Sequence, residues 1–245
     1  MKELCRRDYQ MDVDTRLVGK TLYVGTVLDG LVGQDLSLRM EMLNKLEGAM
    51  LNSVRVALST DAELNFLVLK ARDSRLGVSM TLIRYFPDVK SLLYYRISRS
   101  DSEDRLVFET INSAEQESPD SWKDITMTEF YARLAASRMG RLLSSNPLVG
   151  VFLQIHRVRG DFGTDGVMYL TVDKYTSAPS SHLLTDEILK TAVVDIVSDI
   201  IGKYGAKDII TAVTVKDETG KILLTLKENE LIKSAEQRKN TKHLG

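Results

Sequence analysis

The sequence has few of the residues from which cross-links and metal sites are built. A single cysteine, Cys5, is present among 245 residues, together with three histidines. One thiol makes no internal disulfide, and a structural zinc site needs several cysteine or histidine ligands. The histidines, His156, His182 and His243, share no metal-ligand spacing with one another or with a carboxylate. The composition therefore excludes a disulfide scaffold and predicts no metal site.

Long apolar runs are absent as well. No stretch reaches the roughly 18 apolar residues of a membrane-spanning helix, so we expect no membrane span. The segment Met1–Arg7 has no apolar region before its charges, which predicts no signal peptide and a cytoplasmic location for the sequence as given. The alternative is a cell-envelope protein from which an upstream leader was removed.

Neither sign of charge dominates. The chain has 33 Lys and Arg against 34 Asp and Glu, which gives a formal net charge of −1. A near-neutral balance argues against nucleic acid or an anionic membrane as the main partner. The hydrophobic fraction of 43% is that of an ordinary globular protein, which at this length can be one large domain or two small ones.

Catalytic and cofactor motifs are also missing. The glycines do not reproduce either phosphate-loop spacing, and no Gly-x-Ser-x-Gly motif is present. Asp161-Phe162-Gly163 resembles the magnesium motif of protein kinases, but the other kinase motifs are absent and a hairpin loop explains it. The sequence therefore predicts no catalytic residue and no cofactor.

The first half alternates between strand-like and helix-like patterns. Thr21–Leu28 is rich in β-branched residues, which is typical of a strand. A helix is expected to begin at Asp35, whose carboxylate can cap free amide groups, because apolar residues then recur every three or four positions. Asn65–Ala71 and Gly77–Phe86 flank a short polar turn, which predicts a hairpin. A further strand is expected over Arg105–Ile111.

A polar stretch, Asn112–Asp124, divides the sequence because it is rich in serine and acidic residues and lacks apolar periodicity. After it, Thr126 and Glu129 fit a capping box that opens a second helix, and Thr185 opens a third. The other elements expected in this half are strands over Leu148–Val158 and Val167–Tyr175, a loop over Gly160–Gly166, a hairpin over Ile209–Leu226 and a polar helix over Glu228–Arg238.

These patterns predict an α+β fold. We expect mostly antiparallel sheet(s) built from hairpins, with three main helices packed on one side. The expected domains are an N-terminal α+β half, 1–111, and a C-terminal α+β half, 126–238, or one continuous domain, followed by a frayed tail, 239–245. A helix followed by a hairpin occurs three times, which either an ancient duplication or simple α+β layering would produce. We favour layering, because no residue-level repeat lies beneath the pattern.

Two charged residues interrupt the apolar stripes of the predicted helices. Glu47 falls near the middle of the stripe of the first helix, and Arg138 near the middle of the second. A charge in a core costs several kcal/mol unless it is paired or hydrogen-bonded. Three explanations are open, and we favour the first: each side chain extends past the helix edge to solvent, the two form a buried ion pair, or Arg138 meets an anionic ligand in a pocket.

The sequence favours a non-catalytic protein-interaction or scaffold protein. Methionines on the helix faces, which make an adaptable apolar surface, are Met40, Met42, Met50, Met127 and Met139. Sheet edges also need a partner or self-association. The alternative is a small-ligand sensor or an enzyme whose site is assembled only in three dimensions. Its candidate ligand-binding residues are Glu47, Arg84, Arg138 and His156.

Overall fold

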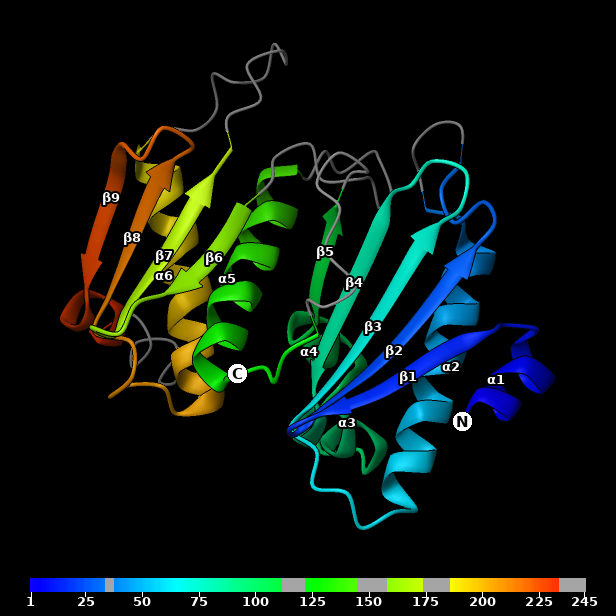
Figure 1. The fold of residues 1–245 in the computed structure, drawn as a ribbon. Coiled ribbons are helices and arrows are strands. Elements are labelled where there is room, and N and C mark those ends of the chain that lie inside the picture. The colour runs from blue at the N-terminus through cyan, green and yellow to red at the C-terminus, as the bar shows by residue number, and fades with distance from the viewer. Residues whose placement is uncertain (34–37, 112–121, 145–157, 174–185, 234–245) are drawn as a thin grey trace. The chain divides into compact units, whose positions relative to one another are not determined.

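The computed structural model of the chain describes residues 1–33, 38–111, 122–144, 158–173 and 186–233. The described residues form two compact units, which we call unit 1 (residues 1–125) and unit 2 (residues 126–233). Each unit contains its own sheet and its own helices (Figure 1).

Unit 1 is built around a five-stranded sheet with the order β1-β2-β3-β4-β5. Its elements are α1 (Lys2–Tyr9), β1 (Val13–Val18), β2 (Thr21–Leu28), α2 (Met40–Leu58), β3 (Phe66–Asp73), β4 (Ser79–Tyr85), α3 (Phe86–Leu93), α4 (Arg99–Asp104) and β5 (Val107–Ile111). All neighbouring strands are antiparallel except β2 and β3, which run parallel. Parallel neighbours need a long crossover connection, and α2 lies in that connection.

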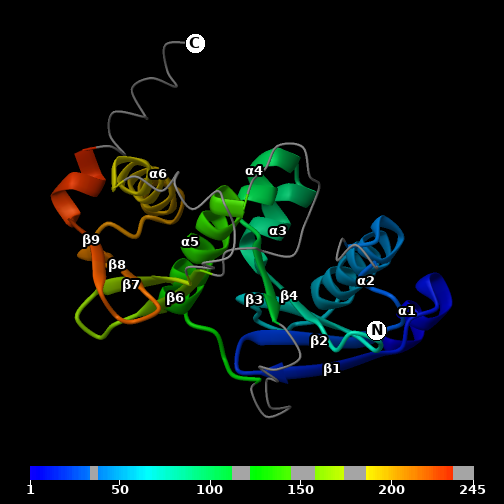
Figure 2. The same cartoon turned by 90° about the horizontal axis from the view of Figure 1, so that it is seen from above.

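The core of unit 1 lies between its sheet and the helices α1 and α2, which pack on one face (Figure 2). On α2, Leu46, Met50 and Val54 recur at helical spacing and are buried. On the sheet, alternate residues of each strand, such as Val24 and Leu69, face these helices because the side chains of a strand point to opposite faces in turn.

Unit 2 contains a four-stranded sheet with the order β6-β7-β8-β9. Its elements are α5 (Met127–Ser144), β6 (Val158–Phe162), β7 (Val167–Val172), α6 (Asp186–Tyr204), β8 (Ala212–Asp217) and β9 (Ile222–Lys227), after which residues 228–233 are helical. The pair β7 and β8 is parallel with α6 in the connection, and the other pairs are antiparallel. Buried Met168, Leu170 and Val172 alternate along β7, as expected for a strand with one face in the core.

The predicted fold class is confirmed. The protein is α+β with mostly antiparallel sheets, and its three long helices are α2, α5 and α6. Both units share the order helix, hairpin, helix, hairpin, with a parallel pair of strands at the centre. The helix–hairpin pattern therefore occurs four times among the described residues, because α1 and β1, which the sequence did not predict, precede the predicted strand β2.

The first long helix begins later than the sequence predicts. α2 starts at Met40, whereas Leu38 forms an isolated β-bridge with Val32. Both bridge residues are buried, so the apolar residues ahead of the helix fill the core instead of extending its stripe. The predicted N-cap, Asp35, lies outside the described residues, and the helix start assigned to it is wrong.

The predicted loop over Gly160–Gly166 is wrong in its first part. Strand β6 runs through Gly160 as far as Phe162. A β-carbon at Gly160 would lie 2.0 Å from the carbonyl oxygen of Ala132, so the glycine lets the backbones of α5 and β6 approach closely. Of the strand predicted over Leu148–Val158, all but Val158 lies outside the described residues.

Candidate functional site

The candidate site lies on the face of the unit 1 sheet that is opposite α1 and α2. Val24 on β2 and Leu69 and Ala71 on β3 face the helices. Because side chains alternate along a strand, their sequence neighbours on β2 and β3 point to the opposite face. Gly25 and Val27 lie there on β2. The strand register places the two β2 residues beside Lys70 and Arg72 of β3, respectively.

An open groove of about 730 Å³ crosses β1, β2 and β3 on this face. The surface that lines the groove is mostly apolar, and its residues are Asp12, Val13, Asp14, Gly25, Thr26, Val27, Lys70, Ala71, Arg72 and Trp122. In the register, Asp14 of β1 lies opposite Gly25, which in turn lies opposite Lys70. The groove thus has an acidic bank on β1, an uncharged floor on β2 and a basic bank on β3.

The floor is made by one glycine and one exposed valine. The side chain of Val27 is 65% exposed, which is unusual for a valine in a strand. A β-carbon at Gly25 would lie 3.4 Å from Cζ2 of Trp122, so the tryptophan ring packs directly against the glycine. Glycine within a strand often marks such a close approach.

Hydrogen bonds hold the chain around Trp122 against the sheet. The hydroxyl of Tyr23 donates to the carbonyl oxygen of Lys123 at 2.6 Å. The hydroxyl of Thr21 donates to the carboxylate of Asp124 at 2.8 Å. These contacts join residues that are about 100 positions apart in the sequence, and they place the tryptophan at one wall of the groove.

The aromatic wall continues into the basic bank. The rings of Trp122 and Tyr23 are stacked, with centroids 5.2 Å apart and an interplanar angle of 8°. The ammonium group of Lys70 lies 5.7 Å from the centroid of the Tyr23 ring, within the range of a cation–π interaction. An aromatic surface beside a cation is therefore built into the groove.

The two banks differ in how far their charges are already paired. On the acidic side, Asp12 and Asp14 form ion pairs of 2.6 Å with Arg6 and Lys2 of α1. The hydrogen bond from Lys2 lowers the pKa of the Asp14 carboxyl. On the basic side, Arg72 is exposed and makes no ion pair with any residue that the structure describes. Arg72 is thus a cation of the groove that remains open to a partner.

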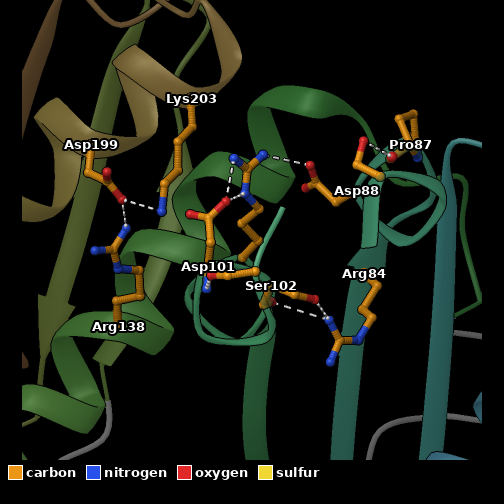
Figure 3. A network of polar contacts seen from close by, with 11 residues as sticks. Arg84, Pro87, Asp88, Asp101, Ser102, Arg138, Asp199 and Lys203 are labelled. Carbon is orange, nitrogen blue, oxygen red and sulfur yellow. Dashed lines mark hydrogen bonds and ion pairs between the residues drawn. The ribbon is translucent and has the colours of Figure 1, made fainter. Parts of the chain in front are cut away.

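The residues singled out from the sequence lie elsewhere. Glu47 is 61% exposed and lies 4.0 Å from Arg99, so its carboxylate reaches solvent instead of the core. The predicted stripe includes residues before Met40, where α2 begins. Arg84 donates from Nη1 to the hydroxyl of Ser102 at 2.7 Å (Figure 3). Burial lowers the pKa of the Arg84 guanidinium, and the charge of Glu47 partly offsets this effect.

A second set of ion pairs joins α3 to α4 in unit 1. Arg105 lies 2.7 Å from Asp88 and 2.9 Å from Asp101, and the arginine side chain is only 15% exposed. Figure 3 shows these two aspartates together with Arg84 and Ser102. The groups hold the short helices to each other and to β4, which is a structural role.

Arg138 is paired within unit 2. Its Nη1 lies 2.5 Å from the carboxylate of Asp199, which also accepts Lys203 at 3.0 Å (Figure 3). The Asp199 side chain is 22% exposed, so this ion pair is largely shielded from water. Burial acts to raise the pKa of the Asp199 carboxyl, but the hydrogen bonds from Arg138 and Lys203 outweigh it, and the net shift is downward.

Of the four predicted residues, the three that the structure describes do not line the groove. Glu47 and Arg84 are close enough to interact electrostatically, Arg138 belongs to unit 2, and His156 lies outside the described residues. The sequence contains two signals for the groove. Trp122 is the only tryptophan and lies in a polar stretch, and Gly25 interrupts an apolar strand.

Among the described residues that line the groove, the charged side chains are carboxylates, a lysine and an arginine, and none carries a thiol or an imidazole. These groups can recognise a partner. Within the described ranges, no group of three or more His, Cys, Asp or Glu residues could hold a metal ion. Cys5 is buried in unit 1, and burial raises the pKa of its thiol, which disfavours the reactive thiolate.

Among the helices that the structure describes, none is long and apolar enough to cross a membrane. No protein-family model matches the sequence, and no curated protein matches it.

Proposed function

We propose that the protein is a non-catalytic interaction protein that binds a partner protein through the groove of unit 1. The observation that supports this proposal is the solvent-open strip of Gly25 and Val27 between two charged banks, beside the Trp122 ring. Binding energy in protein interfaces concentrates on tryptophan, tyrosine and arginine, and all three residue types lie at this groove or in contact with it.

Unit 2 provides an internal comparison, because its four strands are arranged like β1–β4 of unit 1. On its face opposite the helices, the positions that correspond to Val27 and Arg72 are held by Thr171 and Lys216, which are also neighbours across a parallel pair. A threonine at this position is ordinary for a solvated sheet face, whereas an exposed valine is not. The fold itself therefore does not require the apolar floor of unit 1.

The shape of the groove favours a polypeptide over a small molecule. A small-ligand site usually encloses most of the ligand surface. The groove is instead open to solvent and crosses three strands, so a small molecule would remain largely exposed in it. A chain that lies along the strands would contact the floor and both banks together.

The test compares two matched substitutions in the full-length chain. Val27→Glu places a charge on the groove floor, and Thr171→Glu places the same charge at the corresponding position of unit 2. We expect wild type and Thr171→Glu to retain a stoichiometric partner from the native cell, and Val27→Glu to lose it. Circular dichroism establishes that both variants are folded. A partner retained equally by the folded Val27→Glu variant would refute the proposal.

A further inference from the structure

We infer that the occupant of the groove is an extended peptide segment that carries acidic side chains at every second residue. This inference rests on the proposed function, which it deepens by naming the chemistry of the partner. It is carried by the spacing of the cations on β3 and by the open charge of Arg72, which contrasts with the paired carboxylates of Asp12 and Asp14.

The basic bank has the repeat of an extended chain. Lys70 and Arg72 are two positions apart on β3 and point to the same face. Two residues along a strand span about 6.7 Å, which is also the spacing of alternate side chains in an extended peptide. A segment that lies along β3 can therefore bring successive alternate carboxylates to Lys70 and Arg72 without changing its backbone conformation.

The net attraction of the groove is for negative charge. Asp12 and Asp14 already bind Arg6 and Lys2, whereas Arg72 has no ion pair within the described part of the chain. A guanidinium binds a carboxylate with two parallel hydrogen bonds, and a partner's carboxylate can meet Arg72 in this way.

The acidic bank restricts the occupant to one row of carboxylates. The strands β1 and β3 are separated by two strand spacings, or about 10 Å, which is the width available above the floor. A second row of acidic side chains would face Asp12 and Asp14 and would be repelled. An occupant with neutral residues between its acidic ones avoids this repulsion. The methyl groups of such neutral residues can pack against Val27 and Trp122.

The same feature argues for a peptide over a nucleic acid. A phosphate backbone carries charge at every residue and favours a continuous basic track with aromatic stacking. Here the basic bank is faced by two carboxylates, which a polyanion would approach closely. The alternation of charge and neutrality in a peptide fits the groove better.

Trp122 gives a direct measurement of occupancy, because it is the only tryptophan in the chain and lies at the groove. The probe is a blocked peptide of alternating glutamate and threonine, titrated into the full-length protein while tryptophan emission is followed. The controls are a peptide of the same composition with its glutamates grouped together, an alternating lysine–threonine peptide and a single-stranded oligothymidine. We expect saturable binding of the alternating glutamate peptide and at least about tenfold weaker binding of each control.

Charge reversal provides the second arm. Arg72→Glu alone, at an exposed position, should weaken the binding of the glutamate peptide about tenfold. The double variant Lys70→Glu, Arg72→Glu should bind the lysine peptide more tightly than the glutamate peptide. Lys216→Glu, at the position of unit 2 that corresponds to Arg72, should leave binding unchanged.

Equal binding of both charge types, equal binding of the oligothymidine, or indifference to Arg72→Glu would each overturn the inference. A partner that is captured in a Val27-dependent manner, without affinity for the glutamate peptide, would overturn this inference alone. Capture that does not depend on Val27 would instead refute the proposed function.

Discussion

Asp73 at the end of β3 offers a sharp test of what holds unit 1 together. Its side chain is fully buried, and its carboxylate accepts backbone amides from two separate loops. One oxygen accepts Val32 at 2.9 Å, and the other accepts Arg75 and Leu76 at 2.8 Å each. Burial acts to raise the pKa of this carboxyl, but the amide hydrogen bonds outweigh burial, and the net pKa is lowered.

The expected cost of Asp73→Asn follows from these bonds. A hydrogen bond to a charged group contributes about 1.5–3 kcal/mol. Asparagine keeps the shape and one acceptor, but it places an NH₂ group against the remaining amides, so the bonds on one side are lost. We therefore expect the free energy of unfolding of unit 1 to fall by roughly 2–4 kcal/mol, which is a large part of a typical domain stability.

The pH dependence has a definite sign. Because the pKa of Asp73 is lower in the folded chain than in the unfolded chain, its stabilisation is complete above the unfolded pKa of about 3.9. The stabilisation is lost as the pH falls through the folded pKa. In the Asp73→Asn variant, the stability of unit 1 should not show this loss as the pH falls.

The assay is urea unfolding followed by tryptophan fluorescence, which reports on unit 1 because Trp122 is the only tryptophan. The matched control is Asp217→Asn. Asp217 ends β8 in the same way and accepts the amides of Thr219 and Lys221 in unit 2. The control should leave the fluorescence transition in place. A shift of under about 0.5 kcal/mol for Asp73→Asn, the size typical of neutral surface changes, would refute the reasoning.

Two further predictions concern unit 2, where unfolding is followed by circular dichroism. Gly160→Ala should destabilise unit 2 by about 3 kcal/mol, because the added β-carbon would meet a backbone carbonyl of α5. Gly202→Ala is the control, because it lies in open space on α6, and it should stabilise unit 2 by about 0.5–1 kcal/mol. Equal effects of Gly160→Ala and Gly202→Ala on stability would contradict the close approach of the α5 and β6 backbones. Asp199→Asn should lower the free energy of unfolding by about 3–5 kcal/mol, because it removes the carboxylate that both Arg138 and Lys203 bind. Arg138→Met should lower the free energy of unfolding clearly less, because Lys203 still pairs with Asp199. The reverse order would show that Arg138 does not depend on this carboxylate.

Local pattern was a good guide to the elements and a poor guide to their ends and partners. The hairpin of β3 and β4 follows from alternation around a polar turn, and it forms as predicted. The start of α2 was misplaced because Leu38 pairs with Val32 across a loop, which no helical period reveals. The loop predicted over Gly160–Gly166 includes the end of strand β6, because Gly160 looks like a turn residue until Ala132 packs against it.

The candidate site shows the same division. Helical spacing singled out Glu47 and Arg138, but each forms its ion pair with a residue that the spacing could not identify. The groove depends on Trp122 meeting Gly25, and these residues are distant in the sequence. A lone tryptophan and a glycine in a strand were visible in the sequence, but their contact was not.

The sequence by itself determined most of the helices and strands, because hydrophobic period and turn chemistry act over only a few residues. Only the tertiary structure decided that β2 lies parallel to β3, that α1 and α2 cover the same face, and that Trp122 closes a groove on the other. These outcomes depend on which distant surfaces bury each other best. That free energy belongs to the packed chain as a whole, and no short segment carries it.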